Sequence, residues 1–342
     1  MRVGIRCDAR PRIGAGHLIR CVALAEELVR RGTEVVFLGE VEGPAWIRAQ
    51  LDSRGLPLIP APAPATELAA AARRAGLDAM VIDSYETDPA CGRELRRAGL
   101  TVLAIVDGDL RGQEADLYLD QNLGAEETAT DLPRGAVRLA GAGYVLLRDS
   151  VRLLRPVRPR AATRGPARML CVFGGTDTAD AAPAVTRLAA ETSAPFRATV
   201  VAARAGTVAA LAALPLAPGQ SVTPIPPTDR LPRLAAGADL AVSAAGSATW
   251  ELMCLGVPAA LIWVAGNQRL GYEATVSRGL TAGLGNPAEY GDPAVRTQAI
   301  ATLRRLLLDP AERDALARRG HGLIDGRGRE RVADALLGHP RR

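Results

Sequence analysis

The sequence predicts an α/β fold of two domains, each built around a parallel β-sheet. A chain of 342 residues, 48% of them apolar, is long enough for two cores at roughly 150 residues per domain. Short apolar runs alternate with longer segments of helical period, which is the pattern of βαβ units. Near the middle of the chain this alternation stops across residues 155–166, where arginine, proline and glycine recur. We therefore expect two Rossmann-like domains joined by one linker.

The first domain is expected over residues 1–150 and the linker over residues 151–166. Apolar runs bounded by turn residues predict strands near 2–7, 34–39, 79–83 and 101–106. Helical periodicity predicts helices near 18–31, 43–53, 66–75 and 88–98. Because each strand is followed by a helix, the strands of this domain should be parallel.

The second domain is expected over residues 167–342. Its strands are predicted near 168–173, 198–202, 239–243 and 258–263, with helices near 179–191, 206–213, 246–255 and 267–278. Three further helices, near 294–307, 310–320 and 327–337, close the chain, and the last is a candidate to cross back over the first domain. This pattern fits two-domain glycosyltransferases, periplasmic binding proteins and some dehydrogenases alike. In all of them ligands bind beyond the carboxyl ends of the strands, so the loops there carry the candidate sites.

Composition argues against several classes of function. All apolar runs stop well short of the ~20 residues that span a bilayer, which excludes a membrane-spanning protein. The 42 basic side chains are all arginine and exceed the 37 acidic ones, but they gather in the linker and at the C-terminus without interleaved aromatics, so we expect no nucleic-acid partner. Five cysteines without a C-x-x-C pair are typical of a reducing compartment, and the N-terminus begins with a strand instead of a signal segment. We expect a cytoplasmic protein.

The first candidate loop runs through Gly14 and Gly16 to His17, directly before a helix. A Gly-x-Gly turn lets backbone amides approach a ligand, and a helix N-terminus favours the neutral imidazole that a general base needs. His17 is therefore a candidate catalytic base, while the alternative interpretation is a helix-capping histidine. The other two histidines, His321 and His339, lie in the arginine-rich tail. The loop lacks the third glycine of the dinucleotide fingerprint, and a chain without lysine has no P-loop.

Two more loops of the first domain carry acidic residues after a strand. Asp83 and Tyr85 follow the strand near 79–83 and could bind a sugar or carry a proton, or could serve turn formation and packing alone. Asp107 and Asp109 form a D-x-D spacing that can hold Mg²⁺ against a diphosphate, although such spacings are also common in turns. We predict no metal ligands.

The second domain offers a diphosphate site at the start of a helix. Ser243 ends a strand, and Gly246, Ser247 and Thr249 follow at the first turn of the next helix, where a diphosphate could meet amides and hydroxyls without a metal. Glu251, one turn further, is placed to accept hydrogen bonds from a ribose diol. The alternative is a capped helix with an exposed glutamate.

Two further loops of this domain complete the candidate site. Gly174, Gly175 and Thr176 follow an apolar strand and form a second plausible phosphate loop. Asn267 and Gln268 follow the strand near 258–263, and their amides could orient a sugar or a water, or could cap a turn and helix.

Six segments, in the same order along residues 1–285, together resemble a known family. They are I-G-A-G-H-L-I-R-C at 13–21, I-D-S-Y at 82–85, Y-V-L-L-R at 144–148, F-G-G-T-D at 173–177, S-A-A-G-S-A-T-W-E-L at 243–252, and G-V-P followed by N-Q at 267–268. The chain resembles the UDP-2,4-diacetamido-2,4,6-trideoxy-β-L-altropyranose hydrolases of pseudaminic acid biosynthesis. That family is similar in fold to the peptidoglycan N-acetylglucosaminyl transferases, which implies two domains facing each other across a cleft in a GT-B arrangement.

The resemblance implies metal-independent hydrolysis at C1 of a UDP-sugar, with inversion and without a cofactor. It assigns His17 as the catalytic histidine, Tyr85 as the active-site tyrosine and Asn267 as the asparagine near the sugar. The UDP-holding segment of the family matches Gly246, Ser247 and Glu251.

Two positions depart from the family's pattern. Ser84 stands where many members have histidine, and Val151 stands where an aromatic usually follows the arginine motif. We therefore expect a remodelled sugar pocket. A glycosyltransferase on the same scaffold and a non-catalytic nucleotide-sugar binding protein are the alternatives.

Overall fold

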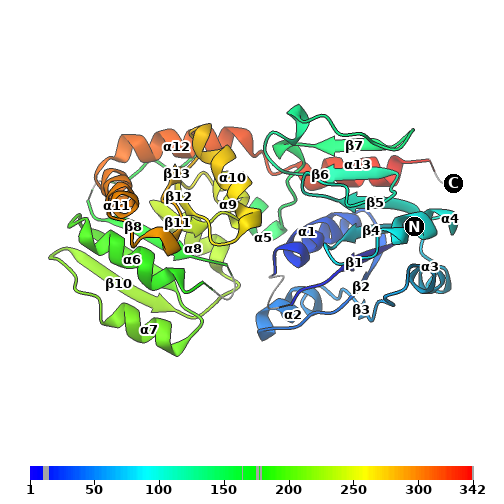
Figure 1. The fold of residues 1–342 in the computed structure, drawn as a ribbon, viewed down its shortest axis with the longest axis horizontal. Helices are drawn as coiled ribbons and strands as arrows, with labels where there is room; N and C mark the ends of the chain where they lie inside the picture. Colours follow the sequence, from blue (N-terminus) through cyan, green and yellow to red (C-terminus); the bar gives the residue numbers. More distant parts are fainter. Residues whose placement is uncertain (11–14, 164, 175–176, 178, 341–342) are drawn as a thin grey trace. The chain divides into compact units, whose positions relative to one another are not determined.

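The structure, a computed structural model, describes residues 1–10, 15–163, 165–174, 177 and 179–340. The chain divides into two compact units. In Figure 1 the first unit runs from blue to teal and includes the red helix near the C-terminus, and the second runs from green to orange-red. The first unit comprises Met1–Asp149 and Gly326–Arg342, and the second comprises Ser150–Asp325. Gly14, Gly175 and Thr176, which the sequence singled out, lie outside the described residues.

Among the described residues, the first unit has a sheet of seven parallel strands in the order β3-β2-β1-β4-β5-β6-β7. The strands are β1 (Arg2–Cys7), β2 (Glu34–Leu38), β3 (Leu58–Ile59), β4 (Ala79–Asp83), β5 (Thr101–Ile105), β6 (Leu117–Asp120) and β7 (Val137–Ala140). The helices are α1 (Gly16–Arg30), α2 (Ala45–Asp52), α3 (Ala65–Arg74), α4 (Ala90–Arg97) and α13 (Gly328–Gly338), with short turns η1 (Ala125–Glu127) and η2 (Ala142–Tyr144).

Alternate residues of the central strands point to opposite faces of the sheet, and each face is covered by a different set of helices. On β4, Val81 belongs to a core with residues of α1, α2 and α13, whereas Met80 and Ile82 belong to a core with residues of α3 and α4. Because both faces are covered, β4 and β5 read as unbroken apolar runs with every residue buried. These runs are the reason the sequence predicts them correctly.

The second unit has, over the residues described, a six-stranded parallel sheet in the order β10-β9-β8-β11-β12-β13. The strands are β8 (Ala167–Val172), β9 (Phe196–Val201), β10 (Gln220–Ile225), β11 (Leu240–Ala244), β12 (Ala259–Ile262) and β13 (Ala282–Gly283). The helices are α6 (Ala181–Glu191), α7 (Ala205–Ala212), α8 (Leu231–Gly237), α9 (Ser247–Cys254), α10 (Gly266–Ser277), α11 (Pro293–Leu308) and α12 (Pro310–Leu323), with the turn η3 (Pro287–Glu289). A short helix, α5 (Asp149–Arg152), stands where the first unit ends.

The predicted strands and helices are confirmed to within three residues at each end, and the missed strands lie at or near sheet edges. β3 and β13 have two residues each, which is too short for a periodicity to register. β10 is an edge strand that contains Pro224, and none of its six residues is buried. Both sheets therefore contain more strands than the apolar runs indicate.

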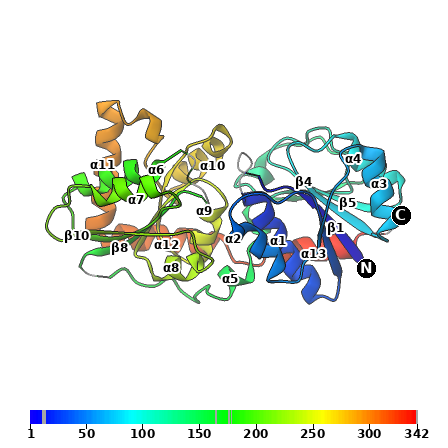
Figure 2. The same cartoon turned by 90° about the horizontal axis from the view of Figure 1, so that it is seen from below.

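The last helix, α13, packs on the first unit against α1 and η2 (Figures 1 and 2). Val332, Ala333 and Leu336 are fully buried in the core of that unit. Arg329, 1% exposed, donates to Glu26 on α1 at 2.8 Å and also pairs with Asp149. The end of the chain is thus part of the first unit.

In each sheet the strand order reverses once, and the reversal marks the expected ligand position. In the first unit it lies between β1 and β4, which lead to α1 and to the loop after Asp83. In the second unit it lies between β8 and β11, which lead to the loop of Gly174 and to α9. Most of the sequence motifs with candidate chemistry follow these four strands, while Asp107 and Asp109 follow β5 and Asn267 and Gln268 follow β12.

We predict that Gly328→Ala destabilises the first unit. A methyl group on Gly328 would collide with the backbone of Tyr144 and Val145, which α13 approaches closely. Overpacking of this kind costs about 1–3 kcal/mol, measurable by urea unfolding. The control is Gly322→Ala in α12, where nothing stands within 4 Å and a gain of up to about 1 kcal/mol is expected. Equal effects of the two changes would contradict the packing described for α13.

Candidate active site

The reversal point of the first sheet brings His17 and Asp83 together. His17 is the second residue of α1, and Asp83 is the last residue of β4, opposite Cys7 in the ladder between β1 and β4. The side chain of His17 is 8% exposed and that of Asp83 is fully buried. Two loops that are 66 residues apart in sequence therefore meet in one buried polar cluster.

His17 and Asp83 form a short hydrogen bond of 2.6 Å between Nδ1 and Oδ1. Burial alone would raise the pKa of Asp83, but the charge of Arg20 and the hydrogen bonds from Arg20 and His17 outweigh burial and hold that pKa well below its usual range. Arg20 Nη2 also lies 3.2 Å from Nδ1, but it is closer to Asp83 Oδ1, at 2.6 Å. An ionised carboxylate can only accept, so from the shorter contact we infer that Nδ1 carries the proton of the neutral ring. Nε2 is then left with its lone pair, as a general base requires.

Arg20 lies one turn further along α1 and makes a two-pronged contact with the same carboxylate. Its Nε donates to Asp83 Oδ2 at 2.7 Å and its Nη2 donates to Oδ1 at 2.6 Å. Cys21 adds a thiol donor to Oδ2 at 3.4 Å. Each oxygen of Asp83 thus has two donors, and a fork of this kind is the strong form of a carboxylate contact.

Tyr85 covers His17 from the neighbouring loop. The two rings meet edge to face, with centroids 4.7 Å apart and planes at 86°. The Tyr85 hydroxyl donates to Asp107 Oδ2, and the guanidinium of Arg111 lies 4.5 Å from the ring centroid. Burial and then the Asp107 charge raise the pKa of Tyr85 well above its usual value, so the phenol remains a donor at neutral pH. With 45% of its surface exposed, Tyr85 remains open to a ligand.

Asp107, in the loop after β5, accepts hydrogen bonds from several residues of the cluster. Its Oδ1 accepts from Arg20 Nη1 at 3.2 Å and from Asn122 Nδ2 at 3.1 Å. The second acid of the D-x-D spacing, Asp109, accepts instead from the backbone N–H of Arg111 at 2.8 Å. The two acids therefore have different partners, and within the described ranges no three His, Cys, Asp or Glu residues are grouped as metal ligands.

The sequence reasoning missed Arg20, Asn122 and the part that Asp107 plays. Arg20 could have been found, because residues three apart on a helix share a face and His17 and Arg20 are so spaced. Asp107 and Asn122 follow β5 and β6, and only the strand order places their loops beside that of Asp83.

In the second unit, the start of α9 presents the residues predicted to hold a diphosphate. Gly246 is the N-cap residue in extended conformation and is exposed, and within the described part of the chain no side chain makes a capping hydrogen bond to the helix. Ser247 is half-buried, and the Ser243 hydroxyl donates to the carbonyl of Ala244. The Thr249 hydroxyl is buried and, among the described residues, has no hydrogen-bond partner. Glu251 is half-buried and takes part in an interaction of its own.

The loop after β8 uses its own carboxylate at the start of α6. Asp177 accepts from the backbone N–H groups of Ala181 at 2.9 Å and of Ala182 at 3.0 Å. Burial raises the pKa of Asp177, and these two amides partly offset that rise. Gly174 is exposed with a φ of 76°, a conformation that favours glycine. Two amides that a phosphate could have used at α6 are thus already bonded.

Asn267 and Gln268 both lie in the first turn of α10 but are used differently. Asn267 is exposed. Gln268 accepts from the backbone N–H of Val264 at 2.9 Å through Oε1 and so braces the turn that leads into the helix. The remaining predicted residue, Gly16, lies in the first unit, where it is the first residue of α1 and precedes His17.

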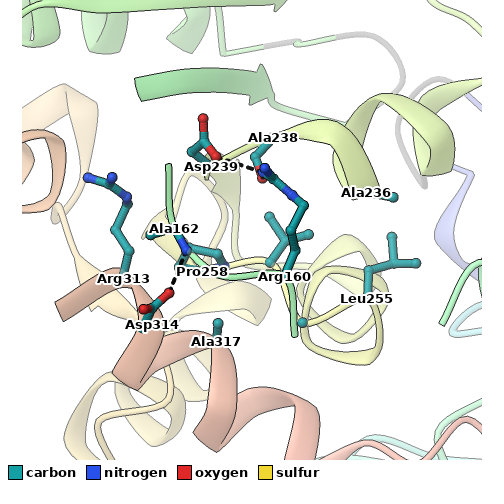
Figure 3. A pocket seen from close by; sticks show the side chains of 12 residues that line it. Arg160, Ala162, Ala236, Ala238, Asp239, Leu255, Pro258, Arg313, Asp314 and Ala317 are labelled. Atoms are coloured by element: carbon teal, nitrogen blue, oxygen red, sulfur yellow. Dashed lines mark hydrogen bonds and ion pairs between the residues drawn. The ribbon is translucent and has the colours of Figure 1, made fainter. Parts of the chain in front are cut away.

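A further polar pocket lies in the second unit, near the opposite, N-terminal end of β11 (Figure 3). Arg160 donates to Asp239 at 2.7 Å, and Asp314 accepts from the backbone N–H of Ala162 at 2.8 Å. Burial would raise the pKa of Asp239, but bonds from Arg168 and Arg160 hold it well below its usual range. The charge of Asp239 is thus paired, and these contacts fasten the segment that contains Arg160 and Ala162 to the second unit.

Comparison with known proteins places the fold. No protein-family model matches the chain, and no curated protein matches it. MurG of Acinetobacter baumannii is similar with a TM-score of 0.70 and 16% identity over 99% of each chain. UDP-GlcNAc 2-epimerase from Neisseria meningitidis, solved bound to UDP-GlcNAc, has a TM-score of 0.66 and 14% identity over 99% of this chain and 100% of that chain. The spinosyn rhamnosyltransferase SpnG has a TM-score of 0.62 and 18% identity over 99% and 100%.

These similarities confirm the predicted fold class: two Rossmann-like α/β units on parallel sheets, as in GT-B-type proteins. No helix in the described part of the chain has the length and apolar character to cross a membrane.

We predict that Asp83→Asn costs about 3–5 kcal/mol of stability at pH 7, because it breaks the buried two-pronged ion pair with Arg20 and leaves the guanidinium only its longer contacts to Asp107. The folded pKa of Asp83 is depressed from its ordinary 3.8, so the ionised carboxylate contributes fully above about pH 4 and progressively less as the pH falls toward the folded pKa. Urea unfolding at pH 7, 5 and 3 should therefore show a difference from the wild type that shrinks only at pH 3. Asp52→Asn, in an exposed pair with Arg48, is the control, with a cost below about 1 kcal/mol. A difference that stays constant down to pH 3 would contradict the assignment.

Proposed function

We propose that this chain is an enzyme that cleaves the C1–O glycosyl–phosphate bond of a UDP-sugar, with water as the nucleophile and inversion at C1. The observation that carries the proposal is the buried Asp83–His17 pair, in which the carboxylate holds Nδ1 and leaves Nε2 as a base. In the reaction, Nε2 takes a proton from water as its oxygen bonds to C1. The C1–O bond breaks and UDP leaves with the electron pair.

Asp83 supports this chemistry through its charge. When Nε2 accepts a proton the ring becomes a cation, and the ionised carboxylate 2.6 Å away stabilises it. General-base assistance of this kind contributes about 10²–10⁴ in rate. Tyr85 is exposed beside the imidazole, and its hydroxyl proton is donated to Asp107, so its oxygen is proposed to accept a hydrogen bond from a sugar hydroxyl.

The leaving group is proposed to bind at the start of α9. UDP leaves readily once its diphosphate charge is compensated, and an uncapped helix N-terminus supplies free N–H groups and a favourable dipole. The unpartnered Thr249 hydroxyl can donate to a phosphate oxygen. Ser247 is proposed to provide a backbone amide, and Gly246, whose own N–H donates to Ala244, is proposed to leave room for the phosphate because it has no side chain. Glu251 is proposed for the ribose diol, and Asn267 and Gln268 for the sugar.

The nucleotide-sugar class has support from two sides. The six motifs resemble hydrolases of a UDP-sugar, and one structural neighbour is an epimerase solved with UDP-GlcNAc. Because this neighbour is only 14% identical, it supports the nucleotide-sugar class and does not indicate which reaction is catalysed.

A glycosyltransferase is the second candidate, because another structural neighbour is a rhamnosyltransferase whose fold aligns over 99% of this chain. In that reaction Nε2 deprotonates an acceptor hydroxyl or amine in place of water. Incubation with UDP-sugars and no acceptor separates the two: steady UDP release supports hydrolysis, and release only after acceptor is added supports transfer.

We predict that His17→Ala lowers UDP release by about 10²–10⁴-fold and leaves UDP affinity within about twofold, since the base is lost while the diphosphate site is unchanged. Stopped assays of UDP release and calorimetric titration with UDP measure the two quantities. His339→Gln, in the C-terminal tail, is the control and should retain full activity. Binding of UDP-sugars without turnover by the wild type would indicate a binding protein, and unchanged turnover in His17→Ala would refute the mechanism.

We predict that Thr249→Val weakens UDP binding about 5- to 10-fold without loss of stability, because the hydroxyl makes no hydrogen bond among the described residues of the free protein. Thr186→Val in α6 is the matched control. Its buried hydroxyl donates to Ala182 at 2.7 Å, so that change should cost stability and leave UDP affinity alone. Loss of stability in Thr249→Val with unchanged UDP affinity would remove Thr249 from the phosphate site.

A further inference from the structure

Arg20 connects two hydrogen-bonded pairs that otherwise share only a ring contact. It holds Asp83, which binds His17, through Nε and Nη2. It also reaches Asp107, which binds Tyr85, from Nη1 at 3.2 Å and from Nη2 at 3.3 Å. With 8% of its surface exposed, the guanidinium is almost removed from water. One buried cation thus serves both the imidazole and the phenol of the proposed reaction.

The charges around Arg20 explain why a cation is needed there. The described groups that face the cluster are His17 and Cys21 from α1, Cys7 from β1, Asp83 and Tyr85 from the end of β4, Asp107 and Arg111 from the loop after β5, and Asp120 and Asn122 from the end of β6. Arg111 stacks on Tyr85 and donates to the carbonyl of Ile105, away from the carboxylates. Asp83 and Asp107 therefore have Arg20 as their shared cation. Burial would raise the pKa of each carboxyl, and the charge of Arg20 is the first effect that lowers it.

We propose that Arg20 is a positioning residue that keeps Asp83 and Asp107 ionised together and so fixes the proton of His17 on Nδ1. The effect on turnover rests on the proposed function, whereas the effect on the His17 proton does not. Without the guanidinium, the buried carboxylate of Asp83 and the partly buried carboxylate of Asp107 would both lose their shared cation, and the cluster would take up a proton at a higher pH. Asp83 would then no longer be a pure acceptor for the ring.

The direct test reads the histidine ring and needs no substrate. The chain has three histidines, so the signals of His17 can be assigned in ¹⁵N-labelled protein by comparison with His17→Gln. In the wild type, the neutral ring should show a protonated Nδ1 and an unprotonated Nε2. In Arg20→Met, the ring should lose this preference, and the pH at which its signals change should rise by about one unit or more.

Two further variants separate positioning from mere stability. Arg20→Lys keeps the charge but not the fork, so it should fold and show an intermediate change in the ring signals. Arg96→Met removes a partly buried arginine that donates to Asp116 at 3.1 Å elsewhere in the same unit. It should lower stability and leave the His17 signals as in the wild type. If Arg20→Met does not fold, Arg20→Lys decides: ring signals identical to the wild type overturn the proposal.

The second test measures turnover. With a UDP-sugar that the wild type cleaves, Arg20→Met should lower kcat about 10²-fold, leave KM within about twofold, and move the acid limb of the pH profile upward by about one unit or more. A loss of kcat with an unmoved acid limb would overturn the positioning role. If no UDP-sugar is cleaved, the proposed function fails, while the ring spectra still decide the role of Arg20.

Discussion

The ionised carboxylate of Asp83, buried without any exposed surface, is the interaction on which the site in the first unit depends. A buried charge is tolerated only when it is paired and hydrogen-bonded, and Asp83 receives donors from His17, Arg20 and Cys21. These donors come from one helix, α1, so the carboxylate fixes how that helix sits on β4. Because Asp83 must be hydrogen-bonded, it fixes the orientation of the His17 imidazole. That orientation leaves Nε2 available as the proposed general base.

Much of the fold could be predicted from the sequence because parallel strands that are buried on both faces appear as continuous apolar runs. β4 and β11 are clear examples, with all residues buried. Strands at or near the edges, such as β10 and β13, lack that signal because they are half exposed or very short. The extra strands matter for function: β6 brings Asn122 to Asp107, and no apolar run indicated it.

The candidate site could be predicted only in part, since a motif names residues and not their partners. His17, Asp83 and Tyr85 were singled out by their places after strands, and the structure brings them together. The D-x-D spacing suggested a pair of equivalent acids, whereas Asp107 joins the buried cluster and Asp109 bonds a turn. The two glycine-rich loops of the second unit looked alike in sequence, yet Asp177 bonds two amides at the start of α6, while no side chain caps α9.

The division of the chain has a consequence for how the protein is made. The second unit, Ser150–Asp325, is an insertion within the first, which is completed only by Gly326–Arg342. A ribosome therefore finishes the whole second unit before it synthesises α13, whose Val332, Ala333 and Leu336 fill the core beside α1. The first unit is therefore completed after the second, and a chain that stopped before α13 would lack part of the core beside the helix that carries His17.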